Sequence, residues 1–195
     1  MSTQLDTKAI KEKIDFLRTL YSQEQHRELF GASTHTSTHK FLLHPCITEK
    51  QVRQFEARHA IHLPEDYRNF LLEVGSGGAG PLYGLFSFGH FGERGLPELA
   101  LPFPHSEHWN PQFKEGDTPV LSEFEDWYFD TKHIFGSMPI CHEGCGYYDL
   151  LVVTGPEHGN VWVDARVSDG GICPLGVSFG PWYSKWLDEC IEKLN

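Results

Sequence analysis

The residues best suited to bind a metal or to act as a nucleophile lie close together in the second half of the chain. They are Cys141, His142 and Cys145, with His158 and Cys173 downstream. Thiolates and imidazoles are the ligands that zinc prefers, and a structural zinc site needs four of them arranged as a tetrahedron. The chain has no second closely spaced cysteine pair to complete such a set. We therefore interpret Cys141 as a small buried thiol on a strand and Cys145 as a turn residue, and predict no metal and no cofactor.

Two histidine pairs also have spacings compatible with metal binding, namely His35 with His39 and His105 with His108. Both pairs lie in segments without helical or strand periodicity, and neither has a carboxylate at a useful offset. We expect these residues to be loop or surface histidines.

No catalytic pair is marked by the sequence. A thiol nucleophile needs a base and a third group that orients the base. His142 does not suit Cys141, because successive strand residues point to opposite faces, although a histidine from another segment stays an open alternative. Asp149 and Asp164 could face each other on neighbouring strands, but polar residues are expected along half-exposed strands. We interpret Asp164 and the nearby Arg166 as an exposed polar rim.

The glycine-rich stretch 75–80 does not resemble a phosphate-binding loop. It lacks the Gly-Lys-Ser/Thr ending of a P-loop, and it follows a predicted helix instead of opening one. We predict a helix stop and a tight chain reversal.

An acidic and aromatic segment over residues 115–130 is the best candidate for a binding surface. Aromatic anchors among charged residues are typical of protein interfaces, and carboxylates would steer a basic partner at long range. The alternative is a solvated loop whose aromatic residues pack on the sheet. The residues that we assign to partner binding are Glu115, Asp117, Glu123, Glu125, Asp126, Trp127 and Tyr128.

Composition limits the classes of function. The 195 residues include 39% apolar residues, which is enough for a core, and carry a net charge of −11, which disfavours nucleic-acid binding. No apolar run is long enough to span a membrane, and the first residues lack the features of a signal peptide. We therefore expect a cytoplasmic protein whose five cysteines are thiols.

The first third of the chain predicts helices. The spacing of Ile10, Ile14, Leu17 and Tyr21 indicates an amphipathic helix over 5–29, followed by a polar loop over 32–40 and a short strand at 41–43. A second helix begins after Thr48, which forms a capping box with Gln51 and a hydrophobic staple between Ile47 and Val52, and it runs to about His59. A third begins with Pro64 at its first position, followed by Glu65 and Asp66, which favour a helix start, and ends at Gly75.

The remainder of the chain predicts a sheet. Residues 82–88 are a candidate strand, 89–119 are expected to be irregular, and 120–130 fit a helix or a loop equally well. Strands at 138–141, 147–154, 161–167 and 172–177 are separated by glycine-containing turns, and a helix follows Ser178. The pattern indicates an α+β fold in which flanking helices pack on a mostly antiparallel meander, with an N-terminal segment over 1–46 and a domain over 47–195.

The order of these motifs resembles the Smi/Knr-like family of the SUKH superfamily. Residues 61–71, which read Ile-His-Leu-Pro-Glu-Asp-Tyr-Arg-Asn-Phe-Leu, and the glycines at 75–78 are similar to its Leu-Pro-acid-aromatic step, Phe-Leu helix and glycine-rich turn. Residues 139–150 and 159–164 look like its central strands. Residues 179–187 are similar to its closing Phe-x-x-Trp-Leu helix, and the likeness covers about residues 47–191.

The resemblance implies a domain that binds other proteins and has no known catalytic residues. Bacterial members are often immunity proteins that neutralise toxins, many of them nucleases, and fungal relatives act as scaffolds in cell-wall synthesis and signalling. We therefore expect a non-enzymatic immunity protein that blocks a basic toxin by stoichiometric binding. A regulatory scaffold for a housekeeping partner is the main alternative, and a thiol- or zinc-dependent enzyme around Cys141, His142 and Cys145 is the other.

Overall fold

The fold is α+β, as the sequence predicts. The computed structural model describes residues 5–22, 39–92, 95–111 and 121–193. Four antiparallel strands pair in the order β1-β2-β3-β4: β1 Ser137–Gly144, β2 Tyr147–Val152, β3 Asn160–Asp164 and β4 Ile172–Ser178. The helices are α1 Thr7–Ser22, α2 Glu49–His59, α3 Glu65–Glu73, α4 Leu121–Tyr128 and α5 Phe179–Glu192, with short 3₁₀ turns η1 Thr131–Ile134 and η2 Arg166–Ser168.

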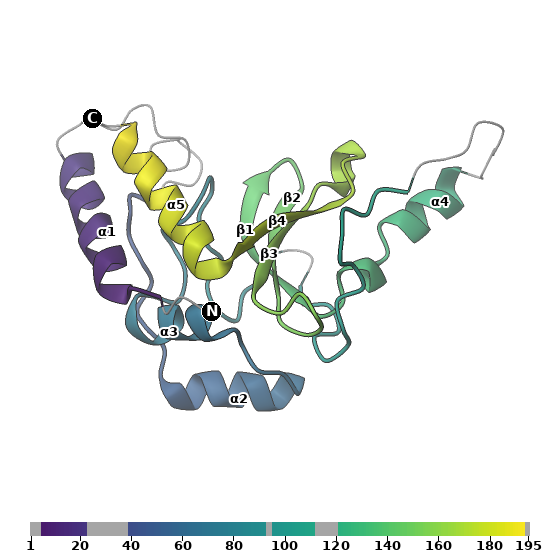
Figure 1. Ribbon diagram of the computed structural model, residues 1–195, viewed down its shortest axis with the longest axis horizontal. Helices are drawn as coiled ribbons and strands as arrows, with labels where there is room; N and C mark the ends of the chain where they lie inside the picture. The colour runs from purple at the N-terminus through teal and green to yellow at the C-terminus, as the bar shows by residue number, and fades with distance from the viewer. Residues whose placement is uncertain (1–4, 23–38, 93–94, 112–120, 194–195) are drawn as a thin grey trace.

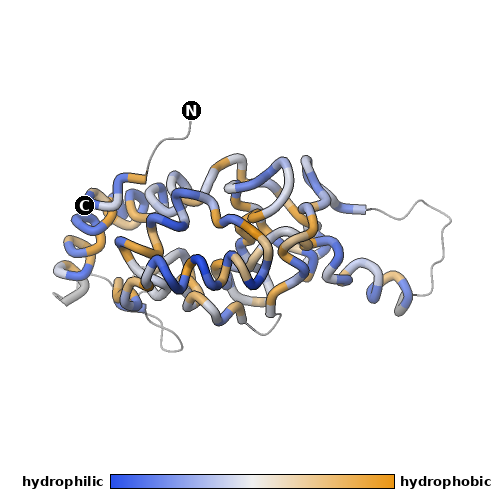
Figure 2. Tube along the Cα trace, turned by 90° about the horizontal axis from the view of Figure 1, so that it is seen from below, coloured by the Kyte–Doolittle hydropathy of each residue, from blue (hydrophilic) through white to orange (hydrophobic). Residues whose placement is uncertain are grey.

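The helices are distributed unevenly around the sheet. In Figure 1, α1 and α5 lie side by side at one end of the molecule with α3 beneath them, while α4 extends from the opposite end. Figure 2 shows the same separation from below, and it shows α2, which lies along this face, as a largely hydrophilic helix. This places α4 far from the helical half of the fold.

The sheet has a core on each face. On one face, residues such as Leu151 and Val161 join the main core with the buried sides of α1, α3 and α5. On the other face, Leu150 and Trp162 pack with Phe103 and Ile134, which come from the irregular segment before α4 and from η1. The second core therefore positions the segments on either side of α4.

The predicted start of α2 is confirmed. Thr48 is the N-cap and forms the capping box with Gln51, Ile47 packs against the core, and Val52 is fully buried. Helix α3 begins one residue later than predicted, because Pro64 has an extended backbone and serves as the N-cap.

Helix α1 confirms the predicted apolar stripe over Ile10, Ile14 and Leu17, which are buried in the main core. The described helix ends at Ser22, and the predicted continuation over 23–29 lies outside the described residues, as do 32–38 of the predicted loop. None of the helices in the described part of the chain is long and apolar enough to span a membrane.

The candidate strands at 82–88 and 41–43 are not strands. Leu85 makes only isolated bridges to Gly78 and Cys141, and Leu43 makes one to Gly78. Leu82 and Gly84 both have positive φ angles, of 48° and 90°, which turn the chain and prevent a continuous ladder. The strand predicted over 161–167 is also shorter than expected: β3 ends at Asp164, because η2 begins at Arg166.

Candidate binding surface

Negative charge is concentrated on the strand half of the molecule. Residues 95–111 and 121–178 contain eleven Asp and Glu residues and two Lys and Arg residues, a formal net charge of −9. The described residues before 93 and after 178 carry nearly equal numbers of both signs. One of the two cations, Arg166, is buried against Asp164, and the other, Lys132, forms an ion pair with Asp130 at 2.9 Å. The field of this half is therefore almost uncompensated.

Helix α4 carries three of the six exposed carboxylates of these residues; the other three are Glu98, Glu107 and Asp169. The side chains of Glu123, Glu125 and Asp126 are exposed, and Trp127 is 39% exposed although it is a large aromatic residue. Phe129 directly after the helix is 43% exposed. The other two residues assigned to partner binding, Glu115 and Asp117, lie outside the described residues. The segment thus combines exposed carboxylates with exposed aromatic rings, the makeup of a protein interface.

Tyr128 does not belong to the exposed surface. Its side chain is 3% exposed and stacks on Trp109 and on Phe124, with ring centroids 5.5 and 5.4 Å apart. Its hydroxyl donates to Oδ1 of Asn110 at 3.4 Å, and burial raises its pKa. The assignment of Tyr128 to partner contact is therefore wrong, since the residue fastens α4 to the fold.

Arg166 fixes the chain where α4 ends. Its Nε and Nη2 donate to the two carboxylate oxygens of Asp164, both at 2.8 Å, and the side chains are 1% and 0% exposed. Its Nη1 donates to the backbone oxygens of Tyr128 at 2.8 Å and Asp130 at 3.2 Å. The predicted exposed rim of Asp164 and Arg166 is therefore wrong: the pair is internal and holds the backbone on both sides of Phe129.

Two histidines complete this attachment. His133 Nε2 lies 3.0 Å from the backbone oxygen of Trp127, and His105 Nε2 lies 2.9 Å from that of His133. The rings of His133 and Trp109 stack with centroids 4.2 Å apart. Burial lowers the pKa of both histidines, and the charge of Arg166 adds to this effect. The neutral imidazoles serve as donors to backbone carbonyls, so they are structural.

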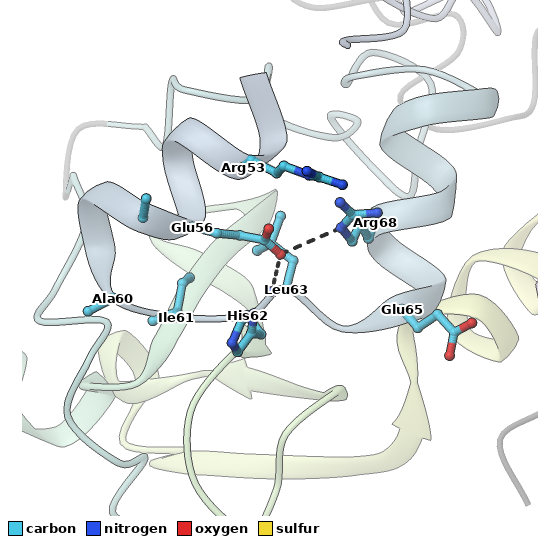
Figure 3. A pocket seen from close by; sticks show the side chains of 9 residues that line it. Arg53, Glu56, Ala60, Ile61, His62, Leu63, Glu65 and Arg68 are labelled. Atoms are coloured by element: carbon cyan, nitrogen blue, oxygen red, sulfur yellow. Dashed lines mark hydrogen bonds and ion pairs between the residues drawn. The ribbon is translucent and has the colours of Figure 1, made fainter. Parts of the chain in front are cut away.

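A separate groove lies between α2 and α3. It has a volume of about 730 Å³ and is lined by Arg53, Glu56, Ala60, Ile61 and Arg68, among others, as Figure 3 shows. Glu56 lies 3.6 Å from Arg68 and also accepts from the backbone N–H of Leu63 at 3.0 Å. These charges neutralise one another, so the groove has no single sign of charge that would select a partner.

A comparison with known protein families identifies the family of the chain. The sequence model of the SMI1 / KNR4 family (SUKH-1) matches residues 46–185, which include all four strands and helices α2 to α4. The chain belongs to the SUKH-1 family. No curated protein and no solved structure gives a significant match.

The cysteine cluster of this SUKH-1 protein is dispersed. Cys141 is fully buried on β1 and its thiol donates to the backbone oxygen of Pro81 at 3.2 Å, whereas Cys145 is exposed in the turn that follows. Burial and the nearby Asp149 raise the pKa of Cys141, which disfavours the thiolate that a nucleophile requires. His142 lies between the rings of Tyr83 and Tyr148, with centroids 5.6 and 4.9 Å away.

The other candidate ligands of this SUKH-1 protein are engaged separately. His39 Nδ1 accepts from the backbone N–H of Phe41, His108 Nε2 lies 2.9 Å from the oxygen of Gly170, and His158 Nε2 lies 2.9 Å from that of His62. His35 lies outside the described residues. Among the residues that the structure describes, no three His, Cys, Asp or Glu side chains are grouped so that they could hold a metal ion.

Asp149 and Asp164 do not face each other. Asp149 aligns with Cys141 and Val163, and Asp164 aligns with Tyr148, so the two carboxylates lie on opposite faces of the sheet. The role of Arg166 was missed by the sequence interpretation. A signal was present, because alternation from the apolar Trp162 places Asp164 on the same covered face. The contact with the backbone of α4 has no sequence signal.

Proposed function

We propose that this SUKH-1 protein is an immunity protein that neutralises a toxin by stoichiometric binding, without catalysis of its own. Family membership supports a protein-binding role. The observation that carries the proposal is the exposed, acidic and aromatic surface of α4 on the strand half, whose net charge is −9. We name this set of residues the α4 surface: Glu123, Glu125, Asp126, Trp127 and Phe129.

The mechanism is occlusion of a basic active-site rim. Nucleases that act on phosphate backbones need a positive surface, and a strongly negative partner competes for it. Carboxylates such as Glu125 and Asp126 accelerate the encounter through long-range attraction, and the aromatic rings supply contact area once the surfaces meet. Such a complex forms in the compartment in which the toxin would act, for which we propose the cytoplasm.

The test is a survival assay. The product of the neighbouring gene is expressed from an inducible promoter in cells with and without this protein. The proposal predicts that cells survive only when the protein is present, and that the two purified proteins form a complex of defined stoichiometry. Survival at substoichiometric amounts of the protein would point to catalysis, and a toxic neighbour that kills with or without the protein would contradict immunity.

The regulatory alternative predicts a different result. A scaffold for a housekeeping protein has no toxic neighbour, and its deletion alone changes growth or cell-wall integrity. Deletion of both genes separates the two: an immunity gene becomes dispensable when its toxin gene is also removed, whereas a scaffold gene does not.

A further inference from the structure

We propose that Trp127 and Phe129 are the two anchors of the α4 surface, that the buried Arg166–Asp164 pair positions them, and that their occupant is a basic amphipathic segment of the partner protein. The inference rests on the proposed function for the identity of the partner. Its chemistry follows from the geometry around Arg166.

Phe129 is held outward from both sides. Nη1 of Arg166 donates to the carbonyls of Tyr128 and Asp130, the residues before and after Phe129, and the guanidinium lies 5.9 Å from the Phe129 ring. Two residues before Phe129, the backbone oxygen of Trp127 lies 3.0 Å from His133 Nε2. The backbone that carries both exposed rings is therefore fixed before any partner arrives, which reduces the entropy lost on binding.

The burial of Arg166 is not explained by stability. Removing two charges from water is costly, and well-packed apolar residues in place of a buried ion pair are often neutral or stabilising. Asp164 uses both of its oxygens on the guanidinium, and the remaining Nη1 is directed at the backbone around Phe129. The Arg166–Asp164 pair therefore has the geometry needed to position the exposed ring of Phe129.

The surroundings specify the occupant. The exposed carboxylates of Glu123, Glu125 and Asp126 have no Lys or Arg partner within the described residues, so an approaching segment must supply positive charge. The exposed rings of Trp127 and Phe129 supply the apolar part of the surface. A segment with lysine or arginine residues alternating with large aliphatic residues meets both requirements.

Synthetic peptides test the anchors directly. The probe is a short peptide of alternating lysine and leucine, and its control is a peptide of alternating glutamate and leucine. Isothermal titration calorimetry should show binding of the lysine peptide only, weakened by added salt, and NMR shifts should centre on residues 121–130. Phe129→Ala and Trp127→Ala should each weaken binding at least about tenfold.

Phe16 provides a matched control. It is 46% exposed on α1, at the end of the molecule opposite α4, so Phe16→Ala removes an equally exposed ring and should leave the affinity unchanged. Equal affinities of Phe129→Ala, Trp127→Ala and Phe16→Ala for the lysine peptide would overturn the anchors. Self-association of the wild-type protein that Phe129→Ala abolishes would overturn the assignment of a foreign basic partner in favour of a second copy.

The survival assay separates this inference from the proposed function. Wild-type protection that Phe129→Ala retains in full would overturn the anchor and leave immunity standing. Peptide binding at α4 without any protection by the wild-type protein would do the reverse. The expected result is protection that Phe129→Ala weakens and Phe16→Ala does not.

The positioning role needs its own variant. The double substitution Asp164→Leu with Arg166→Met removes the charges and the donors while it fills the same interior. The protein should stay folded, with a melting temperature lowered by the two carbonyls that lose their donor, and should lose peptide affinity. Affinity equal to that of the wild type would overturn the role of Arg166. If the double variant does not fold, amide order parameters of the wild-type protein decide: residues 127–131 should be as rigid as β2, and mobility like that of a chain end would refute the clamp.

Discussion

Asp149 is a carboxylate that the fold buries without a counter-charge. Its side chain is 1% exposed and lies near Glu143 and Cys141, and no Lys or Arg is paired with it within the described part of the chain. Burial, together with the charge of Glu143, raises its pKa to about 8. The folded state therefore keeps a proton on Asp149 that the unfolded chain releases near pH 4. As the pH rises from there to about 8, ionisation of Asp149 in the unfolded chain lowers the free energy of unfolding.

Substitution of Asp149 should therefore stabilise the protein at alkaline pH. Asp149→Asn preserves the shape of the side chain and cannot ionise, so its advantage over the wild type in free energy of unfolding should grow by about 2–4 kcal/mol between roughly pH 5 and pH 8. Urea denaturation at several pH values measures this difference. Asp126→Asn, at an exposed position, is the control, and a pH-independent difference for Asp149→Asn would contradict the buried ionisation.

Individual residues also mark what the sequence alone could predict. The exposed state of Glu123, Glu125 and Asp126 follows from their charge. The burial of Tyr128 between exposed neighbours does not, because it depends on Trp109, which lies nineteen positions earlier in the sequence. The function of Arg166 was equally hidden, since its acceptors are backbone carbonyls, and these are the same at every residue.

At the level of elements, α2 shows how local chemistry sets a boundary. The Thr48 backbone N–H and hydroxyl both donate to Gln51 Oε1, at 2.9 and 2.8 Å, and the Thr48 oxygen accepts from the Gln51 backbone N–H at 3.3 Å. Thr48→Ala should lower the free energy of unfolding by about 1 kcal/mol, because the cap is lost. Thr48→Ser keeps the hydroxyl and should lose much less, as denaturation curves can measure; equal losses would show that the cap contributes nothing.

The elements that the sequence predicted correctly are those with signals within a few residues. Caps, the apolar stripe of α1 and the glycine turns of the meander depend on neighbours along the chain. The prediction of a strand over 82–88 was wrong. The aromatic and aliphatic content of this segment favours a strand, but Leu82 and Gly84 turn the backbone there. Residues 120–130 could not be assigned, because the contacts that hold α4 come from β3, η2 and the loop around Trp109.

At the scale of the whole molecule, the fold concentrates negative charge on the strand half, which the net charge of the whole chain does not reveal. The strand half carries a formal charge of −9 out of the total of −11, and α4 presents three of its six exposed carboxylates at the end opposite α1 and α5 (Figures 1 and 2). Like charges concentrated on one side repel each other and oppose compaction. A surface that is retained at this cost in stability is consistent with selection for binding.

Stability and association should therefore respond in opposite directions to neutralisation of α4. Glu125→Gln with Asp126→Asn removes two negative charges that have no Lys or Arg partner among the described residues and that lie near a helix C-terminus, where the helix dipole disfavours them. The change should raise the free energy of unfolding by about 0.5 kcal/mol at low salt. The same variant should bind the proposed toxin more slowly, and stopped-flow association rates should lose part of their salt dependence. Glu49→Gln is the control, because Glu49 is paired with Arg53 and Arg68, so its loss should lower stability without slowing association. A double variant that is less stable than the wild type, or that associates at the wild-type rate, would contradict the proposal that the α4 carboxylates lower stability and accelerate binding of a partner.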